Sequence, residues 1–223
     1  MRKSIPLLLL IPLILTLTGC PWAILTPIAL LKGRDEEPKY NILRRGDIRV
    51  VVVPRSAAFN ASELQNAPNE IARHVNHLLA TKSKNKKLRV VEQQRVEMWL
   101  DDVNNNFDSF LEVGRDVNAD IVIGFTIVGF QIKDPRNPYL IQGRCMVHVE
   151  AFEVATGKLV ASETFTVVDP PSMPHHATNP NVERVFRQDF TLVIARHIAA
   201  LFHPHVPHEI QRINADSINL HRL

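Results

Sequence analysis

The sequence predicts an α/β (α+β) domain in which helices pack on a mixed central sheet of about five strands. Three observations support this prediction. Residues 48–53 form a β-branched run interrupted only by Arg49, amphipathic helical segments follow it, and two long β-rich runs lie near the end of the chain. Strands and helices alternate first and consecutive strands come later, so the predicted order is β-α-β-α-α-β-β-β-α.

The first half of the predicted domain alternates strands with helices. Residues 48–53 are apolar except for Arg49 and end at Pro54, a pattern typical of a central strand buried on both faces. A helix is expected to begin at Pro68 and to end at the Lys-rich residues 82–87, before a short strand at residues 88–91. The next helix has apolar residues at helical spacing: Val96, Trp99, Leu100 and Val103.

A short third helix is predicted around residues 110–117, with its end at Asn118. Asparagine tolerates the left-handed backbone conformation that a helix end often requires. Asp120, two residues later, can accept hydrogen bonds from neighbouring backbone amides. The strongest predicted strand, residues 121–130, follows directly.

The last part of the domain is predicted to be a hairpin followed by a helix. Residues 144–154 and 158–168 are β-rich and are joined by Thr156 and Gly157, which is a hairpin signal. In the first of these strands, one face carries Cys145, Val147, Val149 and Ala151, and the other, more polar face carries Arg144, Met146, His148, Glu150 and Phe152. The final helix is expected over residues 182–202.

The N-terminus has the features of a bacterial lipoprotein signal. Arg2 and Lys3 precede an apolar run, and Leu17, Thr18, Gly19 and Cys20 form a lipobox. We expect residues 1–19 to be removed as a signal peptide and Cys20 to be acylated, which anchors the chain in the lipid bilayer. An uncleaved anchor is the alternative, because apolar residues continue to Leu31, although four prolines interrupt the run.

Three further segments follow from this interpretation. Residues 20–46 are predicted to be a lipid-anchored tether, residues 47–202 a single globular α/β domain, and residues 203–223 a His- and Pro-containing tail. The positive residues precede the apolar run, so the domain is expected to face the periplasm. Pro21, rather than Asp, follows Cys20, and by analogy this favours the outer membrane over the inner one.

Charge and cysteine content narrow the possible partners. The chain has 26 basic and 23 acidic residues, and removal of Arg2 and Lys3 with the signal leaves 24 against 23, a net charge of +1. This balance gives no reason to expect a nucleic-acid partner. With Cys20 acylated, Cys145 has no partner within the chain, so we interpret it as a buried structural thiol.

Two segments resemble a known group of domains. Residues 88–100 (LRVVEQQRVEMWL) are similar to its strand that runs directly into a helix, and residues 113–124 (VGRDVNADIVIG) are similar to its helix end, turn and apolar strand. The group is the envelope-lipoprotein domain shared by the curli-secretion lipoprotein, the outer-membrane activators of penicillin-binding proteins, and the N-terminal domain of the Tol-Pal translocation protein. The resemblance covers about residues 47–202. The two glutamines between Glu92 and Arg95 and the C-terminal tail depart from the pattern.

The resemblance implies a non-enzymatic envelope lipoprotein that acts as an adaptor or regulator in envelope assembly, wall synthesis or secretion. Its expected partners are envelope proteins, and it implies no cofactor. A self-assembling secretion-channel subunit is the alternative, and it implies a homo-oligomer. A channel needs additional amphipathic strands, whereas all five predicted strands are used in the sheet.

A metal-binding or hydrolytic enzyme is a further alternative. His203, His205 and His208 are the weak candidates for metal ligands, since imidazoles at this spacing can reach one ion. Pro204 and Pro207 favour an extended chain, so we prefer a solvated, pH-sensitive tail. The sequence lacks the Gly-x-Ser-x-Gly, phosphate-loop and His-Glu-x-x-His motifs, and no catalytic residue is predicted.

The last predicted helix is apolar around most of its circumference from Phe190 to Phe202. Burial against the sheet is the preferred interpretation, and we expect His197 to be a satisfied histidine within this apolar surface. A partner interface is the alternative. Its candidate residues are Phe190, Ile194, Ile198 and Phe202.

Overall fold

A computed structural model describes residues 35–44, 46–57, 64, 66–134, 137–171, 175–176 and 180–207. All of them belong to one compact unit that begins at Asp35. Cys20 and His208 lie outside the described residues. Among the described helices, none is both long and apolar enough to cross a membrane.

The predicted α/β fold is confirmed. Its elements, in chain order, are η2 (Asn41–Leu43), β1 (Ile48–Ser56), α4 (Ala67–Lys82), β2 (Leu88–Val90), α5 (Gln93–Asp102), α6 (Phe110–Asp116), β3 (Ile121–Asp134), β4 (Asn137–Glu153), β5 (Lys158–Asp169), β6 (His175–His176) and α7 (Pro180–Ala200). Apart from the short η2 and β6, this is the predicted order. The strands lie side by side as β2-β1-β3-β4-β5, and β6 pairs with β4.

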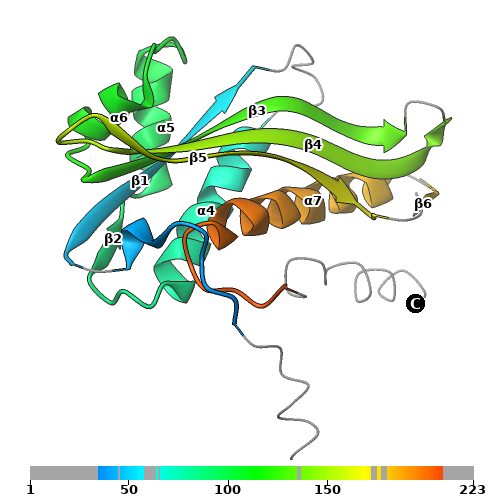
Figure 1. The fold of residues 1–223 in the computed structure, drawn as a ribbon. Coiled ribbons are helices and arrows are strands. Elements are labelled where there is room, and N and C mark those ends of the chain that lie inside the picture. Colours follow the sequence, from blue (N-terminus) through cyan, green and yellow to red (C-terminus); the bar gives the residue numbers. More distant parts are fainter. Residues whose placement is uncertain are drawn as a thin grey trace, which may run out of the picture. The chain divides into compact units, whose positions relative to one another are not determined.

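The sheet consists of a parallel half and an antiparallel half that share β3. β1 pairs in parallel with β2 and with the first part of β3. β3, β4 and β5 then pair antiparallel, and β3 and β4 continue as a long hairpin (Figure 1). Both strands are longer than the sequence predicts. The sequence of residues 131–134 and 137–143 has no clear strand pattern. In the structure these residues nevertheless belong to β3 and β4, which pair here with β-bulges.

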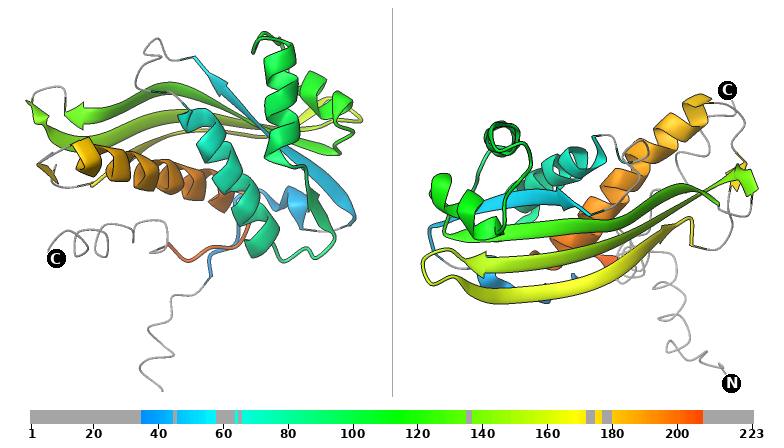
Figure 2. Two further views of the ribbon diagram at one scale, coloured as in Figure 1. Left: turned by 180° about the vertical axis from the view of Figure 1, so that it is seen from behind. Right: turned by 90° about the horizontal axis from the view of Figure 1, so that it is seen from above.

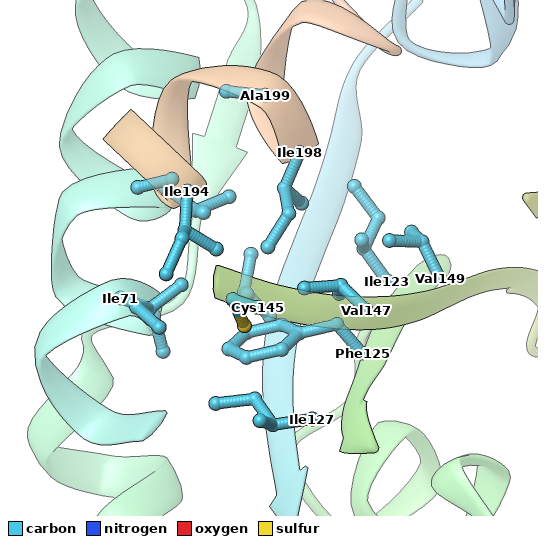
Figure 3. Packing of buried hydrophobic residues seen from close by; sticks show 14 of the residues in the cluster. Ile71, Ile123, Phe125, Ile127, Cys145, Val147, Val149, Ile194, Ile198 and Ala199 are labelled. Atoms are coloured by element: carbon cyan, nitrogen blue, oxygen red, sulfur yellow. The ribbon is translucent and has the colours of Figure 1, made fainter. Parts of the chain in front are cut away.

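Helices cover the two halves differently. α4 and α7 lie on one face of the sheet, whereas α5 and α6 lie on the other face, over the parallel half (Figure 2). The larger core lies between the sheet and α4 and α7. In it, side chains of the two helices point toward those of β3 and β4, as Figure 3 shows for Ile71, Ile194, Phe125 and Cys145. A smaller core lies beneath α5 and α6.

The turn before β3 has the predicted chemistry. Asn118 adopts a left-handed conformation with φ of 54°. The Asp120 carboxylate accepts a hydrogen bond of 2.7 Å from the backbone amide of Arg49, and so joins this turn to the start of β1. Ser109 begins α6 with a capping box that involves Glu112. Gly157 has φ of 69° in the hairpin between β4 and β5.

The folded unit extends beyond the predicted boundaries at both ends. Glu36, expected in the tether, forms an antiparallel bridge with His205, expected in the tail, through backbone hydrogen bonds of 2.7 and 3.1 Å. The Tyr40 amide donates to the Leu201 carbonyl at 2.9 Å, and Leu43 is 1% exposed. These contacts join residues far apart in sequence, so local composition did not reveal them.

Candidate functional site

Beyond the part that α6 covers, one side of the antiparallel half carries no helix within the described part of the chain. Residues that pair directly across neighbouring strands point to the same side of a sheet. The register therefore defines this side, which we call the uncovered face. By register it includes Arg55, Thr126, Gln131, Arg144, Met146, His148, Glu150, Ser162, Thr164, Thr166 and Val168, and the exposed bulge residue Val128 adjoins them on β3.

The opposite side of the same strands is buried beneath α7. Cys145, Val147, Val149 and Ala151 are at most 1% exposed. The predicted alternation along β4 is thus confirmed. A strand with one buried and one exposed face is the usual arrangement of an antiparallel sheet that is covered on one side.

A row of polar side chains crosses the uncovered face. Arg55 pairs with Thr126, Thr126 with His148, and His148 with Thr164, so that the row spans four strands. The Nδ1 atom of His148 lies 2.7 Å from the Thr164 hydroxyl oxygen. Its Nε2 atom lies 3.7 Å from the Glu150 carboxylate, in the neighbouring row.

Arg55 occupies an unusual place at the end of this row. Its guanidinium carbon lies 4.2 Å from the ring centroid of Phe107 and 4.5 Å from that of Phe110. Its Nη2 atom donates a hydrogen bond of 2.9 Å to the Phe107 carbonyl. Arg55 makes no ion pair with any described acidic residue. Two cation–π contacts and one hydrogen bond hold a positive group at the border of the uncovered face.

Apolar side chains continue this surface along β3 and β4. A β-bulge between Ile127 and Gly129 leaves Val128 45% exposed, and Met146 is 44% exposed. Threonines occupy the facing positions on β5. The uncovered face therefore offers apolar, hydroxyl and charged groups together, a composition suited to contact with another molecule.

A hollow lies at the starts of β1 and β3, at the other end of these strands from Arg55. Its volume is about 690 Å³, and its lining includes Asp47, Arg115, Asp120 and Glu153. All three of these carboxylates already have partners, and the Thr156 hydroxyl donates to Glu153 at 2.6 Å. Asp120 accepts from the Arg49 amide, and Asp47 lies 2.9 Å from the Arg89 guanidinium. The Asn-Ala-Asp segment lines this hollow and connects α6 to the sheet.

The tail histidines are arranged differently from the sequence prediction. His203 is 6% exposed, and the side chain of His205 is 16% exposed, so this part of the tail is not solvated. His203 Nδ1 lies 2.6 Å from the Pro204 carbonyl oxygen, and His205 Nε2 lies 3.8 Å from the Glu36 carboxylate. His205 is held by the bridge to Glu36, a contact between residues distant in sequence that local composition does not predict. The described residues contain no group of three side chains able to hold a metal ion.

The four candidates for a partner interface on the last helix lie in the core. Phe190, Ile194 and Ile198 are fully buried, and Phe202 is 3% exposed. This is the burial against the sheet that the sequence favoured, and it leaves no surface for a partner there. His197, beside them, lies with Nδ1 2.9 Å from the Val193 carbonyl oxygen, and burial lowers its pKa. The predicted satisfied histidine is thus confirmed.

Cys145 is a free, buried cysteine, as predicted. Burial raises the pKa of its thiol to about 12. The thiol therefore stays protonated near neutral pH and is unsuited to nucleophilic chemistry.

Sequence reasoning missed Arg55. Arg55 follows an apolar run and Pro54, and it lies on the same strand face as Val51 and Val53. A charged residue at this position marks the point where the helices stop covering that face of β1. That pattern was visible. Its two aromatic neighbours come from the segment between α5 and β3, more than 50 residues away, and sequence alone does not bring them together.

Comparisons with known proteins give structural matches only. No family model and no curated protein matches the chain. The PelC dodecamer from Paraburkholderia phytofirmans matches with a TM-score of 0.45 and 17% identity, covering 78% of this chain and 99% of that one. Lipoprotein GNA1162 from Neisseria meningitidis matches at 0.42 and 11% identity, covering 67% and 99%.

The C-terminal domain of LpoB from Salmonella enterica matches with a TM-score of 0.34 and 20% identity, covering 54% of this chain and 82% of that one. The group of envelope lipoprotein domains that the sequence resembles is represented among these structures.

Proposed function

We propose that this protein is a membrane-anchored envelope lipoprotein whose domain binds another envelope protein through the uncovered face. The observation that carries the proposal is that β3–β5 are buried on one side and open on the other. The open side presents Val128 and Met146, each more than 40% exposed, beside polar groups. The role is that of a non-enzymatic adaptor or regulator.

The membrane anchor is the second part of the proposal. It rests on the lipobox that ends at Cys20 and on the lipoprotein-type sequence segments. An anchor confines the domain to a layer near the membrane, which raises its effective concentration toward partners in the same layer. The proposed site is the periplasmic side of the envelope, with the outer membrane favoured.

Photocrosslinking in intact cells tests the binding surface. A photoreactive residue placed at Thr166 lies on the uncovered face, and one at Lys86, in the exposed loop before β2, is the matched control. We expect Thr166 to capture one identifiable envelope protein that Lys86 does not capture. Equal capture from both positions, or none from Thr166, would contradict the proposal.

The same experiment separates the alternative function. Self-assembly into a channel or ring predicts that Thr166 captures other copies of this chain. Within the described residues, the outer edge of β5 pairs with no other strand, although the Tyr40 hydroxyl donates to the Ser162 carbonyl at 2.7 Å and Lys39 forms an ion pair with Glu163. This unpaired edge is the feature that favours the alternative.

The anchor is tested by the mass of the mature N-terminus. We expect cleavage before Cys20 and an added mass of lipid on that residue, both lost in Cys20→Ser. A mature chain that still begins at Met1 would favour the uncleaved anchor.

A further inference from the structure

We infer that Arg55 is a carboxylate-binding group on the uncovered face, and that the partner segment places an Asp or Glu side chain on it and an apolar side chain on Met146. This inference rests on the proposed function and names the chemistry of the partner. Its starting point is the arrangement around the Arg55 guanidinium.

The guanidinium of Arg55 is held in place before any partner binds. Phe107 and Phe110 contact it, and the Phe107 carbonyl accepts from Nη2. These contacts remove much of the rotational freedom that a free arginine loses on binding. A planar fork of N–H groups remains for hydrogen bonding, and its geometry matches a carboxylate.

The charge of Arg55 is not neutralised within the described part of the protein. The acidic residue of the same face, Glu150, lies in the next row, where it is 3.7 Å from His148. Arg55 is only partly exposed, and a partly desolvated cation without a counter-ion raises the free energy of the unbound state. An arriving carboxylate removes that cost, so charge complementarity favours an acidic partner group over a neutral one.

The distance between Arg55 and Met146 sets the spacing that we expect between the acidic and the apolar residue of the partner segment. Met146 lies two strands away from Arg55 and two residues further along the strand direction. With strands about 4.8 Å apart and a rise of about 3.4 Å per residue, the two positions are about 12 Å apart. An extended segment covers about 13 Å between residues i and i+4, whose side chains share one face. The expected motif is therefore an acidic residue four positions from an apolar one.

Peptide selection tests this motif. The probe is a phage-displayed library of random 12-residue peptides, selected on the full-length protein in detergent. We expect enrichment of peptides with Asp or Glu four positions from a large apolar residue. We also expect Arg55→Gln to weaken their binding at least tenfold, and Arg144→Gln, an equal charge change on the same face without aromatic contacts, to weaken it less than threefold.

A double-mutant cycle separates recognition from a folding defect. Replacing the acidic residue of a selected peptide by its amide should weaken binding to the wild-type protein and leave binding to Arg55→Gln unchanged. Equal losses with both proteins, or equal losses in Arg55→Gln and Arg144→Gln, would overturn the inference.

The outcomes also distinguish this inference from the proposed function. Peptides without acidic enrichment whose binding is blocked by Thr166→Arg would refute carboxylate recognition and leave the docking surface intact. If no selected peptide is blocked by Thr166→Arg, both the inference and the docking surface fail.

Discussion

The parallel and antiparallel halves of the sheet differ in how many of their faces are covered. In the parallel half, Val50, Val51, Val52 and Val53 are all fully buried, because α4 lies on one side and α5 and α6 on the other. In the antiparallel half, burial alternates along β4. The cause is the connections: parallel strands need helical crossovers that cover the sheet, whereas a hairpin needs none. The uncovered face is the result of that difference.

The largest expected effect comes from removing a core side chain of the shared strand. Phe125 is fully buried beneath α4 and α7, whereas Met146 is 44% exposed on the uncovered face. Phe125→Ala should reduce the free energy of unfolding by about 3–5 kcal/mol, and Met146→Ala by at most about 0.5 kcal/mol. Chemical denaturation checks both. A comparable loss at Met146 would mean that this face is covered in solution.

Two glycines of β3 provide a sharper test of the difference in helix coverage between the two halves of the sheet. A Cβ at Gly124 would lie 2.3 Å from the ring of Phe110, whereas a Cβ at Gly129 would meet nothing within 4 Å. Gly124→Ala should cost about 1–3 kcal/mol of unfolding free energy. Gly129→Ala should be close to neutral. Equal melting temperatures for the two variants would contradict the close packing of α6 on the parallel half.

The buried face of the antiparallel half should be sensitive to alkaline pH. The pKa of Cys145 rises from 9.0 to about 12 in the folded protein, because burial penalises the thiolate. Its contribution to stability is therefore complete below pH 9 and is lost as the pH rises from 9 toward 12. Denaturation at pH 8 and pH 10.5 should show a smaller alkaline loss in Cys145→Ala than in the wild-type protein. An equal loss would place this thiol in solvent.

The smallest expected effect is an acid sensitivity of α7. Burial lowers the pKa of His197 below 6.5, so the neutral form is favoured in the folded protein. Its contribution to stability is complete above pH 6.5 and is lost as the pH falls through 6.5 toward the lower folded pKa. Unfolding between pH 7 and pH 5 should depend less on pH in His197→Gln. A His197→Gln variant that keeps the full wild-type dependence on pH would contradict the burial of α7.

Much of the fold was predictable because its signals are local. The β-branched run of β1, the hairpin at Gly157 and the helix end at Asn118 each depend on neighbours within a few residues. The lengths of β3 and β4 were not predictable, since the bulged pairing of residues 131–134 with residues 137–144 of β4 has no local signature. The proposed site was predictable only as a polar strand face.

The sequence by itself determined the strands, the helices, their order and the two unlike faces of β4, because hydrophobic periodicity and turn chemistry act over short separations. Only the tertiary structure decided which groups meet. It placed Phe107 and Phe110 around Arg55, paired His205 with Glu36, and left one face of β3–β5 open. These outcomes depend on contacts between residues distant in sequence, whose partners are chosen by the packing of the whole domain.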